Sequence, residues 1–197
     1  MQHSRPKVFF IGFNKTATTS FHKFFEQQGY KSFHHSKKKK YLGKCILDNL
    51  QEGKDLLYGI NNNDIYSDFC YSTENILYEA TENFKLLDQQ YPNSYFILQT
   101  RNENDWVKSR FNHKSKNKED FYVRAKKALN LDENKLKEYW LLRRRTLHKE
   151  IRDYFTDHPK FVNFDIDNDP IDKIVEFLRT NYDLDPKFWK KYNETNS

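Results

Sequence analysis

The segment from residue 7 to residue 29, KVFFIGFNKTATTSFHKFFEQQG, constrains the fold more than any other part of the chain. An apolar run at residues 8–11 ends at Gly12, a polar segment rich in hydroxyl side chains follows, and phenylalanines then recur at helical spacing until Gly29. This order predicts a buried strand, a tight loop and a helix. Because free backbone N–H groups and the positive end of the dipole favour an anion at a helix N-terminus, we expect the loop to hold a phosphate-like group.

Strand-like and helix-like patterns continue to alternate after this segment. Further strands are expected at residues 30–34, 65–68, 95–98 and 161–164. Helices are expected at residues 41–52, from a cap at Ser72 or Thr73 to Pro92, from a cap at Asn104, at residues 121–128 and 136–155, and from Asp169 as cap with Pro170 at the first helical position. The alternation predicts a three-layer α/β/α fold with a central parallel sheet of about four to five strands. With no linker or repeat, residues 1–197 are expected to form a single domain.

Three polar groups follow strands of the predicted sheet directly. The lysine loop follows the first strand, Asp68 follows the strand at residues 65–68, and Arg101 follows the strand at residues 95–98. Ligands of open parallel sheets bind beyond the carboxyl ends of the strands. We therefore expect these groups to lie along one edge and to form a single site.

Composition limits the classes of partner and the location. A net charge of +6 favours anionic ligands, and 17% aromatic residues are enough to build a core in a polar chain. Cys45 and Cys70 have no metal-binding spacing and are expected to be free thiols. No apolar run approaches the roughly 20 residues of a membrane span, and no signal-like N-terminus is present. A glycan at the sequon Asn14-Lys15-Thr16 would block the loop, so the sequence predicts a cytoplasmic protein without a membrane span.

The loop departs from the Walker A pattern of ATP- and GTP-binding proteins. Residues 12–16, GFNKT, are shorter than GxxxxGK[ST] and lack its second glycine. Asp165 ends a strand but is expected to belong to a turn rather than to a magnesium site. A P-loop kinase of small molecules remains one alternative, and a non-catalytic module that binds nucleotide or nucleic acid through its basic surface remains another.

Two motifs resemble the sulfotransferases that use 3′-phosphoadenosine-5′-phosphosulfate (PAPS). KTATTS at residues 15–20 is similar to their 5′-phosphosulfate loop, Lys-[Thr/Ser]-[Gly/Ala]-Thr-[Thr/Ser]-[Ser/Trp]. ILQTRNENDWVKS at residues 97–109 is similar to their second signature, a strand that ends in Arg with a Ser one or two helical turns later. The resemblance extends through residues 88–101 and 148–166, so it covers nearly the whole chain.

The resemblance implies a role for each matching residue. Lys15 would neutralise charge on the leaving oxygen, and Arg101 and Ser109 would hold the 3′-phosphate of PAPS or of the product, adenosine 3′,5′-bisphosphate (PAP). The remaining residues expected to bind the co-substrate are Asn14, Thr16, Ala17, Thr18, Thr19 and Ser20. Neither a metal ion nor nucleic acid is expected as a partner. The acceptor is expected to carry a hydroxyl, on a carbohydrate, a lipid or a small molecule.

The acceptor hydroxyl needs a general base, and the resemblance places it near the end of the second or third strand. Asp68 is the first candidate, although Cys70 replaces the proline that often follows it in related proteins. His35 is the second, next to His34, and His22 lies one turn into the first helix. Residues 37–64 and 113–131 are expected to build the acceptor pocket.

One family feature is missing. Many members carry a late Arg-Lys-Gly segment that completes the 3′-phosphate site, and this chain has none. The candidates to replace it are Arg143, Arg144 and Arg145, which cannot all face the same way on one helix, and the pair Lys190 and Lys191.

Overall fold

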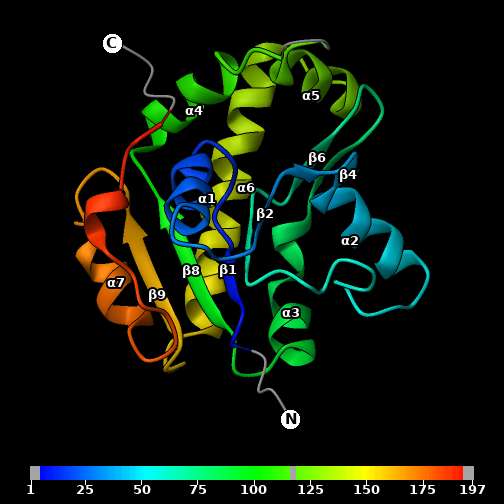
Figure 1. Cartoon of the computed structure of the whole chain (residues 1–197). Coiled ribbons are helices and arrows are strands. Elements are labelled where there is room, and N and C mark those ends of the chain that lie inside the picture. Colours follow the sequence, from blue (N-terminus) through cyan, green and yellow to red (C-terminus); the bar gives the residue numbers. More distant parts are fainter. Residues whose placement is uncertain (1–4, 116–118, 193–197) are drawn as a thin grey trace.

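The structure, a computed structural model, describes residues 5–115 and 119–192. Its centre is a five-stranded parallel sheet in the order β2-β5-β1-β8-β9 (Figure 1). The strands are β1 (Val8–Phe10), β2 (Ser32–His34), β5 (Ile65–Ser67), β8 (Tyr95–Thr100) and β9 (Phe161–Asp165). The predicted α/β class, the parallel sheet and its strand number are therefore confirmed.

Helices cover both faces of the sheet, with α1 in front of it and α6 behind it in Figure 1. They are α1 (Thr18–Glu26), α2 (Leu42–Gln51), α3 (Phe84–Gln90), α4 (Glu103–Phe111), α5 (Phe121–Leu129), α6 (Glu133–Tyr154) and α7 (Asp172–Leu178). Alternate residues of a strand face opposite sides of its sheet. Accordingly, Val8 and Phe10 pack in the core that contains α1 and α7, whereas Phe9 packs in the core that contains α6.

The central position of β1 fixes the entrance to the loop that follows it. The backbone N–H of Gly12 donates to Oε1 of Gln99 at 2.8 Å, and Nε2 of Gln99 donates to the Gly12 carbonyl at 3.3 Å. The Thr81 hydroxyl donates to the carbonyl of Ile11. The loop therefore leaves the sheet from a point that is bonded on two sides.

The helix predicted from Ser72 or Thr73 to Pro92 is wrong over its first half. Residues 70–79 form an antiparallel hairpin of β6 (Cys70–Ser72) and β7 (Leu77–Glu79), and the helical part begins only with the 3₁₀ turn Ala80–Asn83 and α3. The Thr73 side chain does cap, but its hydroxyl accepts the N–H groups of Asn75 and Ile76 within the hairpin turn. Cross-strand pairing of β6 and β7 thus overrides the helical spacing of the apolar residues.

Two predicted helix starts are also displaced. The N-cap of α4 is Asn102 rather than Asn104, and its Oδ1 accepts the backbone N–H groups of Asn104 and Asp105. Helix α7 begins at Asp172 rather than at Pro170. The Asp169 side chain instead accepts the N–H of Asp165, so it closes the turn that follows β9.

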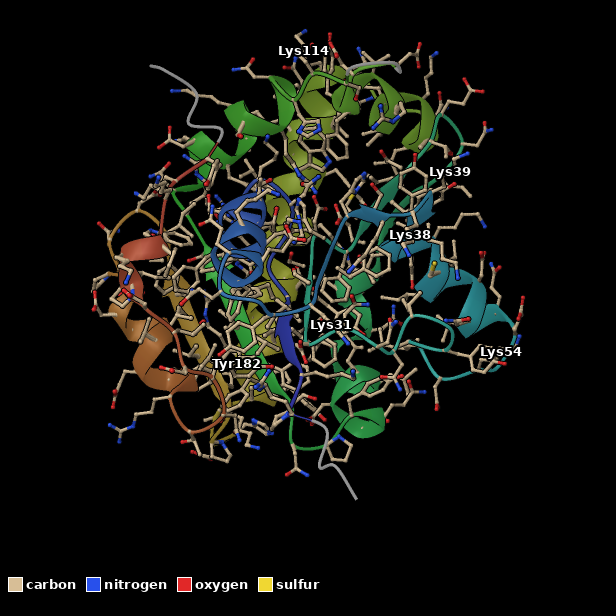
Figure 2. The ribbon with its side chains drawn as sticks, viewed as in Figure 1. Lys31, Lys38, Lys39, Lys54, Lys114 and Tyr182 are labelled. Carbon is tan, nitrogen blue, oxygen red and sulfur yellow. The ribbon has the colours of Figure 1, made fainter. Side chains whose placement is uncertain are left out.

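The lysine run at residues 37–40 forms a second small hairpin, β3 (Ser36–Lys37) with β4 (Lys40–Tyr41). Lys38 and Lys39 occupy its turn with positive φ angles of 50° and 65°, and both are exposed at the edge of the molecule (Figure 2). Cys45 and Cys70 are free, as predicted. Among the described residues, none of the helices combines the length and apolar character needed to span a membrane.

The close contact between β1 and β8 gives a test of the fold. A Cβ added at Gly12 would lie 2.1 Å from the carbonyl oxygen of Gln99, which is backbone and cannot swing away. We expect Gly12→Ala to lower the free energy of unfolding by about 3 kcal/mol, because the two strands would have to separate. Urea denaturation followed by circular dichroism measures this.

Gly59→Ala is the matched control, because Gly59 has φ of 74° with open space around it. An added Cβ meets no atom at this position, so the only cost is that of left-handed backbone for alanine, about 1 kcal/mol. Equal losses in the two variants would contradict the packing described here.

Candidate active site

The carboxyl ends of the strands surround a cavity of about 960 Å³. Nearly every predicted site residue lines it: Asn14, Lys15, Ala17, Thr18, Thr19, Ser20, His35, Asp68, Arg101 and Ser109. Thr16 is the exception among the predicted residues, since its side chain is buried and its hydroxyl donates to the Phe13 carbonyl at 2.5 Å. The topology therefore brings residues from well-separated parts of the chain to one site, as the edge argument predicts.

The loop between β1 and α1 turns on two left-handed residues. Lys15 and Ala17 have φ angles of 68° and 60°, although neither is glycine, and Ala17 is the N-cap of α1. Such strain persists only where the surroundings hold it, and it gathers at functional sites. Burial lowers the pKa of the Lys15 ammonium, opposed by the charge of Asp68 and reinforced by Arg101. The loop thus presents a half-buried cation beside a helix N-terminus, which suits a bound anion.

Helix α4 holds this loop from behind. The indole N–H of Trp106 donates to the backbone carbonyl of Asn14 at 3.0 Å, and Nε of Arg110 donates to Asn14 Oδ1 at 2.8 Å. Arg110 is 1% exposed and forms an ion pair with buried Glu79. A buried charge is tolerated only when it is paired and hydrogen-bonded. The ion pair with Glu79 and the hydrogen bond to Asn14 meet this condition for Arg110, so Asn14 is held in place.

Arg101 and Ser109 also line the cavity. Arg101 directly follows β8, and its buried Nε has no hydrogen-bond partner among the described residues. Ser109 lies on α4 and is 7% exposed at the cavity wall. A guanidinium and a hydroxyl that line the same cavity are a donor set that suits a phosphate.

The two residues predicted as general base lie next to each other. His35 and Asp68 follow β2 and β5, and both have left-handed backbone, with φ angles of 48° and 58°. Nδ1 of His35 is 4.0 Å from Oδ1 of Asp68, and neither atom has a hydrogen-bond partner among residues 5–115 and 119–192. Both residues line the cavity, and a carboxylate or an imidazole is the kind of group that accepts a proton from a hydroxyl.

His22 and His34 also line the cavity, and both rings have partners within the fold. His34 contacts the Ser67 hydroxyl through Nδ1 at 3.2 Å and the Thr19 hydroxyl through Nε2 at 3.3 Å. His22 stacks on His34 and contacts Ser32 at 2.8 Å. Burial, followed by the charge of His34, lowers the pKa of His22 to about 4. Both rings therefore support the start of α1 and the end of β2.

Two cavity residues were missed by the sequence analysis, which named them only within the region 113–131. His113 lies between α4 and α5, and burial together with the Lys15 charge lowers its pKa to about 4. Arg124 on α5 donates to the Ser72 hydroxyl at 3.2 Å and to Ser115 at 3.0 Å. No local motif marks either residue, because only the packing of α5 on the β6–β7 hairpin brings them here.

The candidates to replace the missing Arg-Lys-Gly segment differ in whether they line the cavity. Arg143 and Arg145 form ion pairs with Glu82 and Glu103, away from the cavity. Arg144 is buried and donates to the backbone carbonyl of Arg101. Lys191 lines the cavity itself.

The tail reaches that position through Tyr192, whose backbone N–H donates to the Ser20 hydroxyl at 2.9 Å. Tyr41, Tyr71 and Phe121 line the cavity as well, so the wall that faces His35 is partly aromatic. In the part of the chain that is described, no group of three or more His, Cys, Asp or Glu residues could hold a metal ion.

Comparison with known proteins places the chain in a family. A family model described as a sulfotransferase domain matches residues 7–162. Among solved structures, the chain is similar to the crystal structure of a sulfotransferase from Alicyclobacillus acidocaldarius, at 13% identity and a TM-score of 0.45, over 93% of this chain and 85% of that one. No curated protein matches.

A buried histidine that packs on the loop, His148, predicts that the protein loses stability in acid. His148 on α6 stacks on Phe13 at 5.7 Å, and burial and then the charge of Arg144 lower its pKa to about 3. The unfolded chain binds a proton at this residue below about pH 6.5, whereas the folded protein does not until about pH 3. The contribution of neutral His148 to the free energy of unfolding is therefore fully present above about pH 6.5 and is lost as the pH falls from there to about 3.

Replacing His148 by Phe removes this proton and keeps an aromatic ring on Phe13. We expect His148→Phe to flatten the plot of unfolding free energy against pH between pH 6.5 and 4 by up to about 1.4 kcal/mol per pH unit. Urea denaturation at several pH values measures both slopes. Parallel slopes for the variant and the parent protein would show that His148 does not titrate as described.

Proposed function

The chain belongs to the sulfotransferase domain family, and we propose that it acts as a single domain that transfers a sulfuryl group from PAPS to an acceptor hydroxyl. The observation that carries the proposal is the pairing of two anion sites in one cavity. The Lys15 loop forms one of them, and Arg101 and Ser109, which line the same cavity, form the other. A nucleotide with phosphate at both its 3′ and 5′ positions needs such a pair of sites.

At the loop, backbone N–H groups of residues 16–19 and the hydroxyls of Thr18, Thr19 and Ser20 are the donors for the 5′ end of the nucleotide. The buried side chain of Thr16 leaves only its backbone for this role. At the other end, Arg101 and Ser109 supply donors for the 3′-phosphate, and Lys191 adds a cation to the cavity wall.

In the transfer step, the bond from sulfur to the phosphate oxygen breaks and a bond from sulfur to the acceptor oxygen forms. Lys15 stabilises the negative charge that develops on the phosphate oxygen. The acceptor proton passes to Asp68 or to His35, both of which line the cavity. A half-buried site strengthens each of these electrostatic effects.

The acceptor wall and the cysteines support the remaining parts of the proposal. Tyr71 and Phe121 offer aromatic surface to a ring-bearing carbohydrate, lipid or small molecule. Free thiols at Cys45 and Cys70 suit a reducing compartment, and we propose the cytoplasm.

Thermal stabilisation by nucleotides tests the proposal first. A ligand that binds only the folded protein raises the melting temperature in proportion to its affinity and concentration. We expect PAP at one hundred times its Kd to stabilise the folded protein by about 3 kcal/mol. This stabilisation would raise the melting temperature by several degrees. Stabilisation by ATP with Mg²⁺ but not by PAP would favour a P-loop kinase instead.

Activity measurements test the assigned chemistry. We expect Lys15→Ala to lower kcat by about 100-fold or more, because one charge-stabilising donor is lost. The base is identified by comparing Asp68→Asn with His35→Asn, since asparagine tolerates the left-handed backbone at both sites. Loss of the base is expected to lower kcat by about 100-fold.

Lys149→Ala, at an exposed position of α6 where the lysine pairs with Asp153, is the control that leaves transfer unchanged. If both Asp68→Asn and His35→Asn retain kcat within a few-fold of the parent value, neither residue is the base.

A further inference from the structure

A buried tryptophan packs against two arginines, one of which is bonded to Asn14 and the other to Arg101. Trp106 is fully buried on α4. The guanidinium carbons of Arg110 and Arg144 lie 4.6 Å and 4.9 Å from the centroid of its ring. Arg110 belongs to the same helix one turn later, whereas Arg144 comes from the middle of α6. We call these three residues the Trp106 clamp.

One half of the clamp is bonded to the Lys15 loop. Arg110 donates to the Asn14 side chain, and the indole N–H of Trp106 donates to the Asn14 backbone carbonyl. Asn14 directly precedes Lys15, whose left-handed backbone needs support from its neighbours. Movement of Arg110 or Trp106 would therefore displace the loop.

The other half of the clamp is bonded to Arg101, the residue proposed to hold the 3′-phosphate. Arg144 donates to the backbone carbonyl of Arg101, which lines the cavity. Arg144 is only 4% exposed, and it has no ion pair within the described residues. The face of Trp106, the carbonyl of Arg101 and the charge of Glu103 stabilise its guanidinium, although burial of the charge has a cost.

We propose that the Trp106 clamp fixes the distance between the 5′ loop and the 3′ site, so that Arg110 and Arg144 are positioning residues that make the cavity select a nucleotide phosphorylated at both ends. This inference rests on the proposed function. Neither arginine touches the nucleotide: each acts through one residue, Arg110 through Asn14 and Arg144 through Arg101. The two ends of the site should consequently respond to different substitutions.

Binding of single-phosphate nucleotides separates the two ends. We would titrate PAP, 5′-AMP and 3′-AMP by calorimetry into the full chain and into Arg110→Lys and Arg144→Lys. Lysine keeps the charge but loses the planar donor set of the arginine. We expect Arg110→Lys to weaken 5′-AMP about tenfold and 3′-AMP less than about twofold, and Arg144→Lys to do the reverse. PAP binding falls in both variants.

Controls keep this test independent of folding. Arg145→Lys alters the neighbouring arginine of α6, which is exposed and paired with Glu103, and is expected to change no affinity. Arg101→Ala gives the reference for a lost 3′ site. If Arg110→Lys does not fold, Trp106→Phe removes the indole N–H from Asn14 and should weaken 5′-AMP more than 3′-AMP.

Three outcomes overturn the inference. If the clamp variants weaken both monophosphates by the same factor, or weaken neither, Trp106, Arg110 and Arg144 only stabilise the fold. If the unsubstituted protein binds PAP no more tightly than 5′-AMP, the proposed function fails and the inference with it. Binding of PAP by the parent protein therefore distinguishes failure of the function from failure of the clamp alone.

Discussion

The hydrogen bonds from helix α4 to Asn14 are the interactions on which the site depends. A loop that places Lys15 and Ala17 in left-handed backbone is not stable by itself. It keeps this shape because Gly12 is bonded to Gln99 on one side and Asn14 to Trp106 and Arg110 on the other. The buried ion pair of Arg110 with Glu79 then ties the same loop to the β6–β7 hairpin. The shape of the loop is thus fixed by the fold itself, which is the condition that the proposed electrostatic stabilisation of a transition state requires.

The remaining parts of the site follow from the topology of the sheet. Parallel strands end at a common edge, so the residues after β1, β2, β5 and β8 meet although they are distant in sequence. Left-handed residues occur after three of these strands, at Lys15, His35 and Asp68, and they turn the chain sharply at the cavity. The basic side chains Lys15, Arg101 and Lys191 at this edge are consistent with a doubly anionic ligand.

The fold was largely predictable because its signals are local and repeated. The run ending at Gly12, and the strand ending at Arg101, show strand length and apolar character without ambiguity, and both were found. The segment that contains Ile76 was not, because its apolar spacing also suits a helix and only pairing with residues 70–72 decides the outcome. For a similar reason, the sequence did not predict that His113 and Arg124 line the cavity or what surrounds Arg110. Their roles come from contacts among α4, α5 and the β6–β7 hairpin, which no short motif encodes.

In the proposed function, one nucleotide lies across this edge of the sheet with its two phosphates in separate sites. A crystal structure of the protein with PAP is the decisive measurement, because both phosphates can be located in the same electron density. We expect the 5′-phosphate within hydrogen-bond distance of the Lys15 ammonium and the N–H groups at the start of α1, and the 3′-phosphate against Arg101 and Ser109. A nucleotide bound outside the cavity, or one whose 3′-phosphate is far from Arg101, would contradict it.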